Sequence, residues 1–176
     1  PRLNFASFFK QLAPLGLSVM LALMAPAVAA NPRPNFVIFI ADDVSAADLG
    51  CYGNGVIQTP HIDALAAQGV LFTNAYLTIS SCSPSRSSII TGRYPHNTGA
   101  SELHRLLPED QVRFPRLLKD AGYHTVLSGK VHGIEKDDAA FDIITEGGWP
   151  DHPGASEDWV QLTQDRPKDK PFLFWF

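Results

Sequence analysis

The sequence lacks any block of like charge. Asp and Glu number 18 against 14 for Lys and Arg, and neither sign is clustered. This balance excludes the basic patch by which a protein binds nucleic acid, and an anionic substrate would need local positive groups. Hydrophobic residue types make up 45% and charged types 18%, which excludes a disordered chain and favours a globular protein with one core.

Long hydrophobic runs are also lacking, except for one near the N-terminus. Arg2 and Lys10 flank the start of an apolar run over residues 12–24, and the small residues 27–30 follow it. This order is typical of a secretory signal peptide with its cleavage site. The run is shorter than the roughly 20 residues that a membrane-spanning helix needs. We therefore expect residues 1–30 to be a signal peptide, whose cleavage leaves no stable membrane insertion.

The predicted signal peptide implies export, which determines the compartment and allows disulfides. We expect the mature protein, starting near Asn31, to be periplasmic or secreted, or lysosomal if its source is eukaryotic. Exported proteins can form disulfides. A bond between the only two cysteines, Cys51 and Cys82, is therefore the simplest hypothesis for them.

The two ends of the sequence predict a piece of a longer protein. The sequence begins at Pro1 without an initiator Met. It stops within the apolar run 171–176, which is typical of a buried strand that needs neighbours.

Strand and helix patterns alternate along the rest of the chain. Residues 36–41 form a continuous apolar run, which predicts a strand buried on both faces. Thr59 and Pro60 predict a helix start, and Gly69 predicts its end. Further strands are predicted at 70–76 and 125–128, and further helices at 84–90, 114–121 and 158–164. This alternation predicts an α/β fold, with a mainly parallel or mixed sheet sandwiched by helices.

Polar residues follow two of the predicted strands, where ligands collect in such sheets. Asp42 and Asp43 come directly after the first strand, and two adjacent carboxylates suit a hard cation such as Ca²⁺. Asp is also common in turns, where it accepts bonds from backbone donors. Lys130 and His132 follow a later strand, and their simplest interpretation is a solvated loop.

Residues 81–93 carry the most specific pattern. Ser-Cys-Ser-Pro-Ser-Arg occupies positions 81–86, and Thr-Gly-Arg follows at 91–93. The pattern resembles the sulfatase signature, in its cysteine form. In that family a dedicated maturation enzyme reads a Cys-x-Pro-x-Arg element and oxidises the Cys to formylglycine, an aldehyde. The resemblance implies that Cys82 is modified, which leaves it unable to pair with Cys51.

Three further segments resemble sulfatases in the same order along the chain. They are the opening strand with its metal-binding pair at 34–43, the first helix at 59–66, and the Gly-Lys-x-His element at 129–132. The resemblance implies an alkaline-phosphatase-like fold, with residues 31–176 as the N-terminal part of the catalytic domain.

The finer similarity is to the heparan N-sulfatases, or sulfamidases. It lies in residues 79–88, in Leu103-His104, and in the Gly-Lys-Val-His element at 129–132 followed by Glu135. It implies a sulfated sugar substrate such as N-sulfoglucosamine, and a place in glycosaminoglycan degradation. His104 itself receives no role, because single histidines are commonly structural.

The family resemblance also implies a metal site. Asp42, Asp43 and the formylglycine at Cys82 would hold Ca²⁺, which would polarise sulfate and lower the pKa of the attacking hydroxyl. Sulfatases take a second pair of metal ligands from positions well downstream of Phe176. We therefore expect these 176 residues alone to be inactive.

Three further residues receive catalytic roles from the resemblance, beside the nucleophile precursor Cys82. Arg86 would hold an oxygen of formylglycine, Lys130 would bind sulfate, and His132 would act on the formylglycine hydroxyl or on sulfate as acid or base. Two alternatives remain: a phosphonate monoester or phosphodiester hydrolase of the same superfamily, and a non-catalytic exported fragment.

Overall fold

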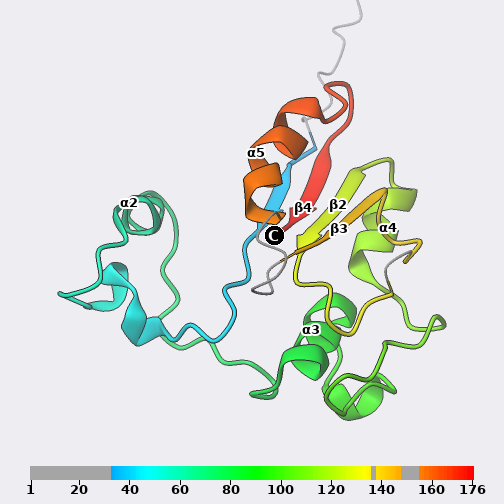
Figure 1. Cartoon of the computed structure of the whole chain (residues 1–176), viewed down its shortest axis with the longest axis horizontal. Helices are drawn as coiled ribbons and strands as arrows, with labels where there is room; N and C mark the ends of the chain where they lie inside the picture. Colours follow the sequence, from blue (N-terminus) through cyan, green and yellow to red (C-terminus); the bar gives the residue numbers. More distant parts are fainter. Residues whose placement is uncertain (1–32, 136–137, 148–154) are drawn as a thin grey trace, which may run out of the picture. The chain divides into compact units, whose positions relative to one another are not determined.

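Four parallel strands form one sheet in the computed structural model, in the order β1-β4-β2-β3 (Figure 1). They are β1 (Phe36–Ile38), β2 (His124–Gly129), β3 (Ile143–Glu146) and β4 (Phe172–Trp175). In the register of the two central strands, Val126 of β2 lies opposite Phe174 of β4. The strand pairs among the described residues are all parallel, so their carboxyl ends share one edge.

The structure describes residues 33–135, 138–147 and 155–176. The predicted signal peptide at residues 1–30 lies outside them. Residues Pro34–Phe176 form one compact unit. No helix in the described ranges is long and apolar enough to cross a membrane.

Strand β4 is apolar throughout because it lies inside the sheet with a layer against each face. Phe174 and Phe172 pack on one face with Trp159 and Leu162 of α5 (Ala155–Asp165). Trp175 packs on the other face, in a second buried cluster that includes Ile90 and Leu127. The partly buried Phe114 packs against this cluster. Full burial of each large apolar side chain contributes roughly 1.5–3 kcal/mol.

The helices of the second face carry recognisable start and stop signals. Helix α3 (Cys82–Thr91) ends at Gly92, whose φ of 67° is a left-handed conformation that glycine adopts without steric cost. Helix α4 (Phe114–Asp120) has Pro115 in its first turn. The other helices are α2 (Pro60–Gln68), between Thr59 and Gly69, and the 3₁₀ turns η1 (Ala46–Asp48), η2 (Gly50–Tyr52) and η3 (Pro95–Asn97).

The predicted fold class is confirmed: the sheet is parallel and has helices on both faces. The helices predicted at 114–121 and 158–164 are present as α4 and α5, and the strands predicted at 125–128 and 171–176 are present as β2 and β4. Helix α3 starts two residues before the predicted Pro84, so Cys82 is its first residue rather than a residue ahead of it.

Two predicted strands are wrong in part or in whole. Strand β1 is an edge strand, shorter than the predicted 36–41. It is not buried on both faces as predicted, because no described segment fully covers Val37, which is 48% exposed, or Phe39 just after the strand, which is 64% exposed. Residues 70–76 form no strand, since no other described segment pairs with them. Strand β3 was not predicted, and its alternation of exposed and half-buried residues is a weak signal over four residues.

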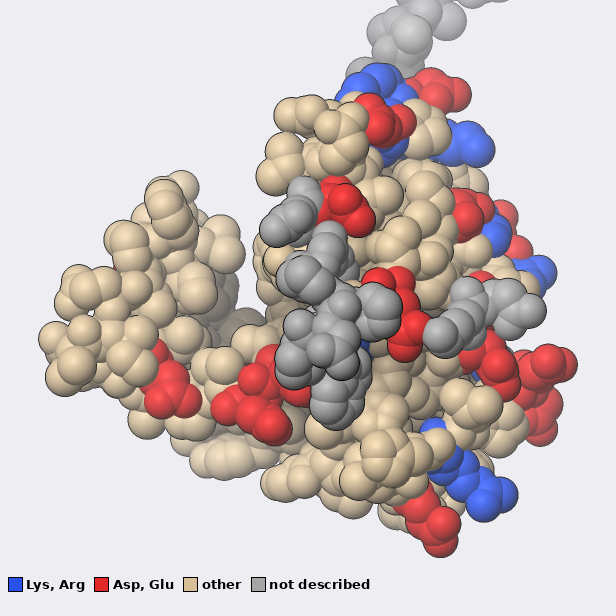
Figure 2. Space-filling view, in the orientation of Figure 1, with Lys and Arg blue, Asp and Glu red and all other residues tan. Residues whose placement is uncertain are grey.

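Charged side chains are dispersed on the face shown in Figure 2. Lys and Arg lie among Asp and Glu there, and no large patch of one sign gathers.

Candidate active site

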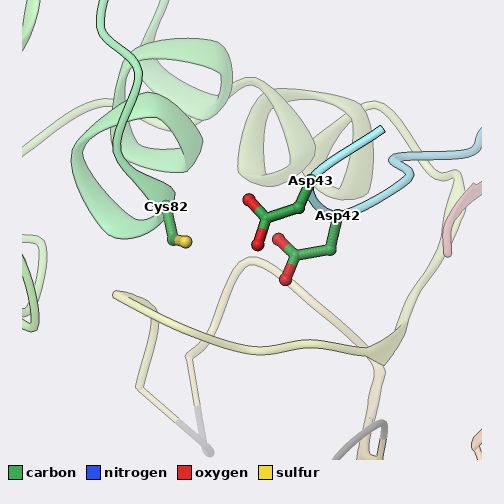
Figure 3. A group of neighbouring side chains, drawn as sticks. All are labelled: Asp42, Asp43 and Cys82. Carbon is green, nitrogen blue, oxygen red and sulfur yellow. The ribbon is translucent and has the colours of Figure 1, made fainter. Parts of the chain in front are cut away.

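The site lies at the carboxyl edge of the parallel sheet. Asp42 and Asp43 follow β1, and Lys130 follows β2, so the common strand direction brings residues far apart in sequence together. Helix α3 presents Cys82 at its first position, and Figure 3 shows the side chains of Asp42 and Asp43 beside Cys82. The N-terminus of a helix favours negative charge at that point.

Asp42, Asp43 and Cys82 form a group of possible metal ligands. One ligand atom from each residue lies within 4.8 Å of the others. The two carboxylates supply hard oxygen donors, and the Cys82 sulfur is the third possible ligand atom. Asp43 has φ 54°, an uncommon conformation that Asp tolerates and that occurs at functional sites. This donor set fits a hard divalent cation.

Lys130 connects the carboxylates to Cys82. Its Nζ lies 2.5 Å from Oδ2 of Asp42 and 3.5 Å from Sγ of Cys82. Burial alone would lower the pKa of Lys130, but the hydrogen bond to Asp42 and its charge outweigh burial and raise that pKa. The same hydrogen bond is the main reason that the pKa of Asp42 lies below its usual value. Lys130 therefore stays an ammonium and Asp42 a carboxylate.

Arg86 supports this pair from inside the protein. Its Nη1 donates to the backbone oxygen of Lys130 at 3.0 Å, and its Nη2 lies 3.7 Å from Oδ1 of Asp42. The residue is 5% exposed. Burial lowers the pKa of Arg86, and the charges of Asp42 and Cys82 oppose that shift. An arginine keeps its charge through such a shift, so it is a fixed positive group at the site.

Small polar residues let α3 pack closely under the site. Ser83, Ser85, Ser87 and Ser88 are all buried. Ser88 accepts a bond from Thr78 at 2.8 Å and donates to a backbone oxygen at 2.6 Å. These bonds satisfy polar groups inside the protein and hold the helix that carries Cys82.

His132 lies at the site, but its contact differs from the predicted one. Its Nε2 lies 2.7 Å from Nδ1 of His104, and the structure gives it no hydrogen bond to Cys82 within the described ranges. Burial lowers the pKa of His132, and the nearby charges of His104, Lys130 and Arg86 lower it further. His104 was not predicted as a site residue, because no spacing or motif in the sequence links it to His132.

A small pocket opens beside these side chains. It has a volume of about 180 Å³ and is lined by His104, Lys130, Val131, His132, Glu146 and Gly147. Lys130 supplies a positive charge, and the imidazoles supply nitrogen atoms that can donate or accept. Glu146 adds a carboxylate, so the pocket offers groups of both charges to a polar ligand.

The two cysteines are both free in the structure. Cys51 is half-buried within η2. Cys82 belongs to the group of acidic residues and cations described above, and it is also half-buried.

The chain is similar in sequence to sulfatases. The chain is 44% identical over 113 residues to the steryl-sulfatase of Rattus norvegicus, covering 58% of this chain and 20% of that protein. It is 37% identical over 129 residues to the N-acetylglucosamine-6-O-sulfatase of Bacteroides thetaiotaomicron, covering 70% of this chain and 23% of that protein. The chain thus spans about a fifth of the length of these curated relatives.

Comparison with solved structures gives the same fold. One structure, in complex with its substrate D-glucosamine-2-N,6-O-disulfate, matches with a TM-score of 0.74 and 29% identity over 82% of this chain and 34% of that one. The phosphonate monoester hydrolase of Agrobacterium radiobacter matches with a TM-score of 0.61 and 18% identity, over 82% of this chain and 40% of that one, which shows a shared fold alone. The Sulfatase family model matches residues 34–175, and the chain therefore belongs to the sulfatase family.

Proposed function

We propose that the protein containing this chain is a sulfatase that hydrolyses a sulfuric ester or sulfamate on a sulfated sugar, using formylglycine made from Cys82 and a calcium ion. One observation carries the proposal. Two carboxylates, an ammonium and a buried guanidinium, from Asp42, Asp43, Lys130 and Arg86, converge on Cys82 at the edge of the sheet. Neither a disulfide between Cys51 and Cys82 nor a solvated loop at Lys130 would require these four charged groups beside Cys82.

The carboxylates of Asp42 and Asp43 would hold calcium together with the modified residue. Bound calcium supplies a positive charge that polarises the sulfate oxygens. Asp42 can act as a metal ligand because its lowered pKa keeps its carboxylate ionised at neutral pH. Lys130 would then bind a sulfate oxygen from the side of the pocket, since its ammonium already lies 3.5 Å from the Cys82 sulfur.

The nucleophile must come from a modified Cys82. A hydrated aldehyde carries two hydroxyls on one carbon. One can attack sulfur and expel the sugar amine or alcohol, and the other can then drive release of sulfate as the aldehyde reforms. Arg86, fixed by its bond to the Lys130 backbone, would hold an oxygen of that group. His132 would accept or supply the proton that these steps move, and its lowered pKa favours the neutral base.

A sugar substrate is supported by two relatives. One is named N-acetylglucosamine-6-O-sulfatase, and one solved structure contains a disulfated glucosamine as its substrate. The steryl-sulfatase has the higher identity over a shorter stretch of this chain. We propose a sulfated amino sugar, with amine or alcohol as leaving group, in glycosaminoglycan degradation. We also propose maturation by a formylglycine-generating enzyme and export to the periplasm or outside the cell.

The decisive experiment is mass spectrometry of the peptide spanning Cys82, taken from the whole protein purified from its native host. Conversion of the thiol to an aldehyde removes sulfur and adds one oxygen, so the modified peptide is lighter. The Cys82→Ala variant is the control, and it should release no sulfate. A fully unmodified Cys82 in protein that still releases sulfate would contradict the proposal.

Activity and metal dependence complete the test. Whole protein should release sulfate from D-glucosamine-2-N,6-O-disulfate, lose that activity after treatment with a chelator, and regain it when Ca²⁺ is added. Phosphonate and phosphate diesters serve as competing substrates. Faster turnover of a phosphonate monoester than of any sulfated sugar would instead assign the site to the phosphonate hydrolase class.

A further inference from the structure

His104 and His132 form a close pair at the mouth of the pocket. Nδ1 of His104 lies 2.7 Å from Nε2 of His132, and the ring centroids are 4.7 Å apart. Both rings line the pocket that also contains Lys130. The two residues are 28 positions apart in the chain, and they come from a loop before α4 and from the segment after β2.

The backbone of His104 has an unusual conformation, and a hydrogen bond holds it in place. Its φ is 65°, a left-handed value that costs energy in a residue with a side chain. Its backbone N–H donates to Oγ of Ser83 at 2.8 Å. Ser83 is fully buried and directly follows Cys82 in helix α3. The helix that carries the nucleophile precursor thus also holds the loop that carries His104.

The contact between the two rings requires one donor and one acceptor. The other ring nitrogen of His132, Nδ1, is buried and has no hydrogen-bond partner among the described residues. A buried N–H without a partner costs about 1–3 kcal/mol. The proton of neutral His132 is therefore favoured on Nε2, from which it is donated to Nδ1 of His104.

We infer that His104 is a positioning residue for His132: it accepts the Nε2 proton of His132 and thereby holds that imidazole in one orientation and one tautomer beside Lys130. The inference rests on the proposed function, because the acid or base role belongs to His132. His104 acts through its neighbour, so its loss should lower kcat more than it raises KM. Neither the sulfatase signature nor the Gly-Lys-x-His element contains this residue.

Two substitutions at one position separate the imidazole from the backbone. In His104→Gly the left-handed backbone is retained without strain, so the bond to Ser83 persists while the imidazole is lost. In His104→Asn the side-chain amide stands near the place of Nδ1 and can accept the proton, and Asn tolerates positive φ. The matched control is His61→Asn, because His61 is exposed on α2.

The readouts are kcat, KM and imidazole ¹⁵N NMR of His132 in the whole protein. We expect kcat to fall about 10- to 100-fold in His104→Gly, as for other residues that orient a functional histidine, with KM changed less than about threefold. His104→Asn should recover most of kcat, and His61→Asn should match the wild type. The ¹⁵N shifts should show one tautomer in wild type and His104→Asn, and a mixture in His104→Gly.

Three outcomes would overturn the inference. They are an unchanged kcat in His104→Gly, a loss that appears mainly in KM, and equal loss in His104→Asn and His104→Gly. Failure of the proposed function is distinguishable, because then the wild type releases no sulfate. The ¹⁵N spectra would in that case still report whether the two imidazoles share a proton.

Discussion

Nζ of Lys130 lies 2.5 Å from Oδ2 of Asp42, across 88 positions of sequence. The two residues follow β2 and β1, which do not pair with each other but both pair with β4. The central strand therefore sets the spacing between the cation and the carboxylate. Their charges stabilise each other, which keeps Asp42 in the ionised form that a metal ligand needs.

Lys130→Met should strongly reduce catalysis while sparing the metal site at neutral pH. Loss of an ammonium that stabilises developing negative charge is expected to lower kcat/KM by about 10²- to 10³-fold. Removing Lys130 also raises the pKa of Asp42 toward its usual value. As the solution is made acidic, the variant should therefore lose calcium affinity at a higher pH than the wild type does. Calorimetry on the whole protein measures this affinity.

The control for that substitution is Lys170→Met, because Lys170 is exposed at the amino end of β4. It should leave both kcat/KM and calcium affinity unchanged. Retention of wild-type kcat/KM in Lys130→Met would contradict the proposed role of Lys130 in binding sulfate.

Arg86→Lys should destabilise the protein although the charge is kept. Arg86 reaches the Lys130 carbonyl and the Asp42 carboxylate from two different nitrogens, and its side chain is 6% exposed. A lysine offers one ammonium, so a buried acceptor loses its donor at a cost of about 1–3 kcal/mol. Urea unfolding measures this cost. Arg116→Lys, in an exposed pair with Asp120, should change stability by less than about 0.5 kcal/mol.

Gly133→Ala should destabilise the protein by more than the positive φ of Gly133 alone explains. Gly133 has φ 86°, and an added Cβ would lie 2.8 Å from Cβ of Ser83. Gly92 also has positive φ, 67°, but no atom lies within 4 Å of its added Cβ. Gly92→Ala should therefore cost about 1–2 kcal/mol, and Gly133→Ala at least about 1 kcal/mol more.

The glycine comparison also has a functional readout, because Ser83 accepts the bond from His104. Displacing Ser83 should lower kcat in Gly133→Ala. Equal losses of stability in the two variants, measured by thermal unfolding, would contradict close packing of this loop on α3.

Asp142 should contribute a pH-dependent part of the stability. Burial alone would raise its pKa, but the backbone N–H of Thr125 at 2.9 Å and the ammonium of Lys119 at 3.2 Å, with a smaller effect of His124, outweigh burial and lower it. A lowered folded pKa gives stability that is present above the unfolded pKa near 3.8 and is lost as pH falls through the folded value.

Asp142→Asn should remove that dependence. The variant should be less stable than the wild type at pH 7, by about 1 kcal/mol or less because the group is partly exposed, and the difference should vanish toward pH 2. Urea unfolding between pH 2 and pH 7 measures it, with Asp169→Asn at an exposed position as the control. A constant difference across this range would show that the carboxylate charge is not responsible.

Local sequence determined the helices and the central strands of this protein. Thr59, Pro60 and Gly69 bound α2, and Gly92 ends α3, because caps and breakers act over a few residues. The apolar run at 171–176 predicted a strand that the structure places inside the sheet. The signature at 81–93 predicted that Cys82 and Arg86 belong to one site, and both lie beside Asp42 in the structure.

The tertiary structure alone decided which segments meet. Strand order depends on pairing between distant residues, such as the bond from the Phe172 backbone to the Asn35 side chain across 137 positions, and no local pattern specifies it. Residues 70–76 have a strand composition but no partner strand among the described residues, so they form none. His104 bonds through its backbone to Ser83 and through its ring to His132, and such contacts leave no periodicity or spacing in the sequence.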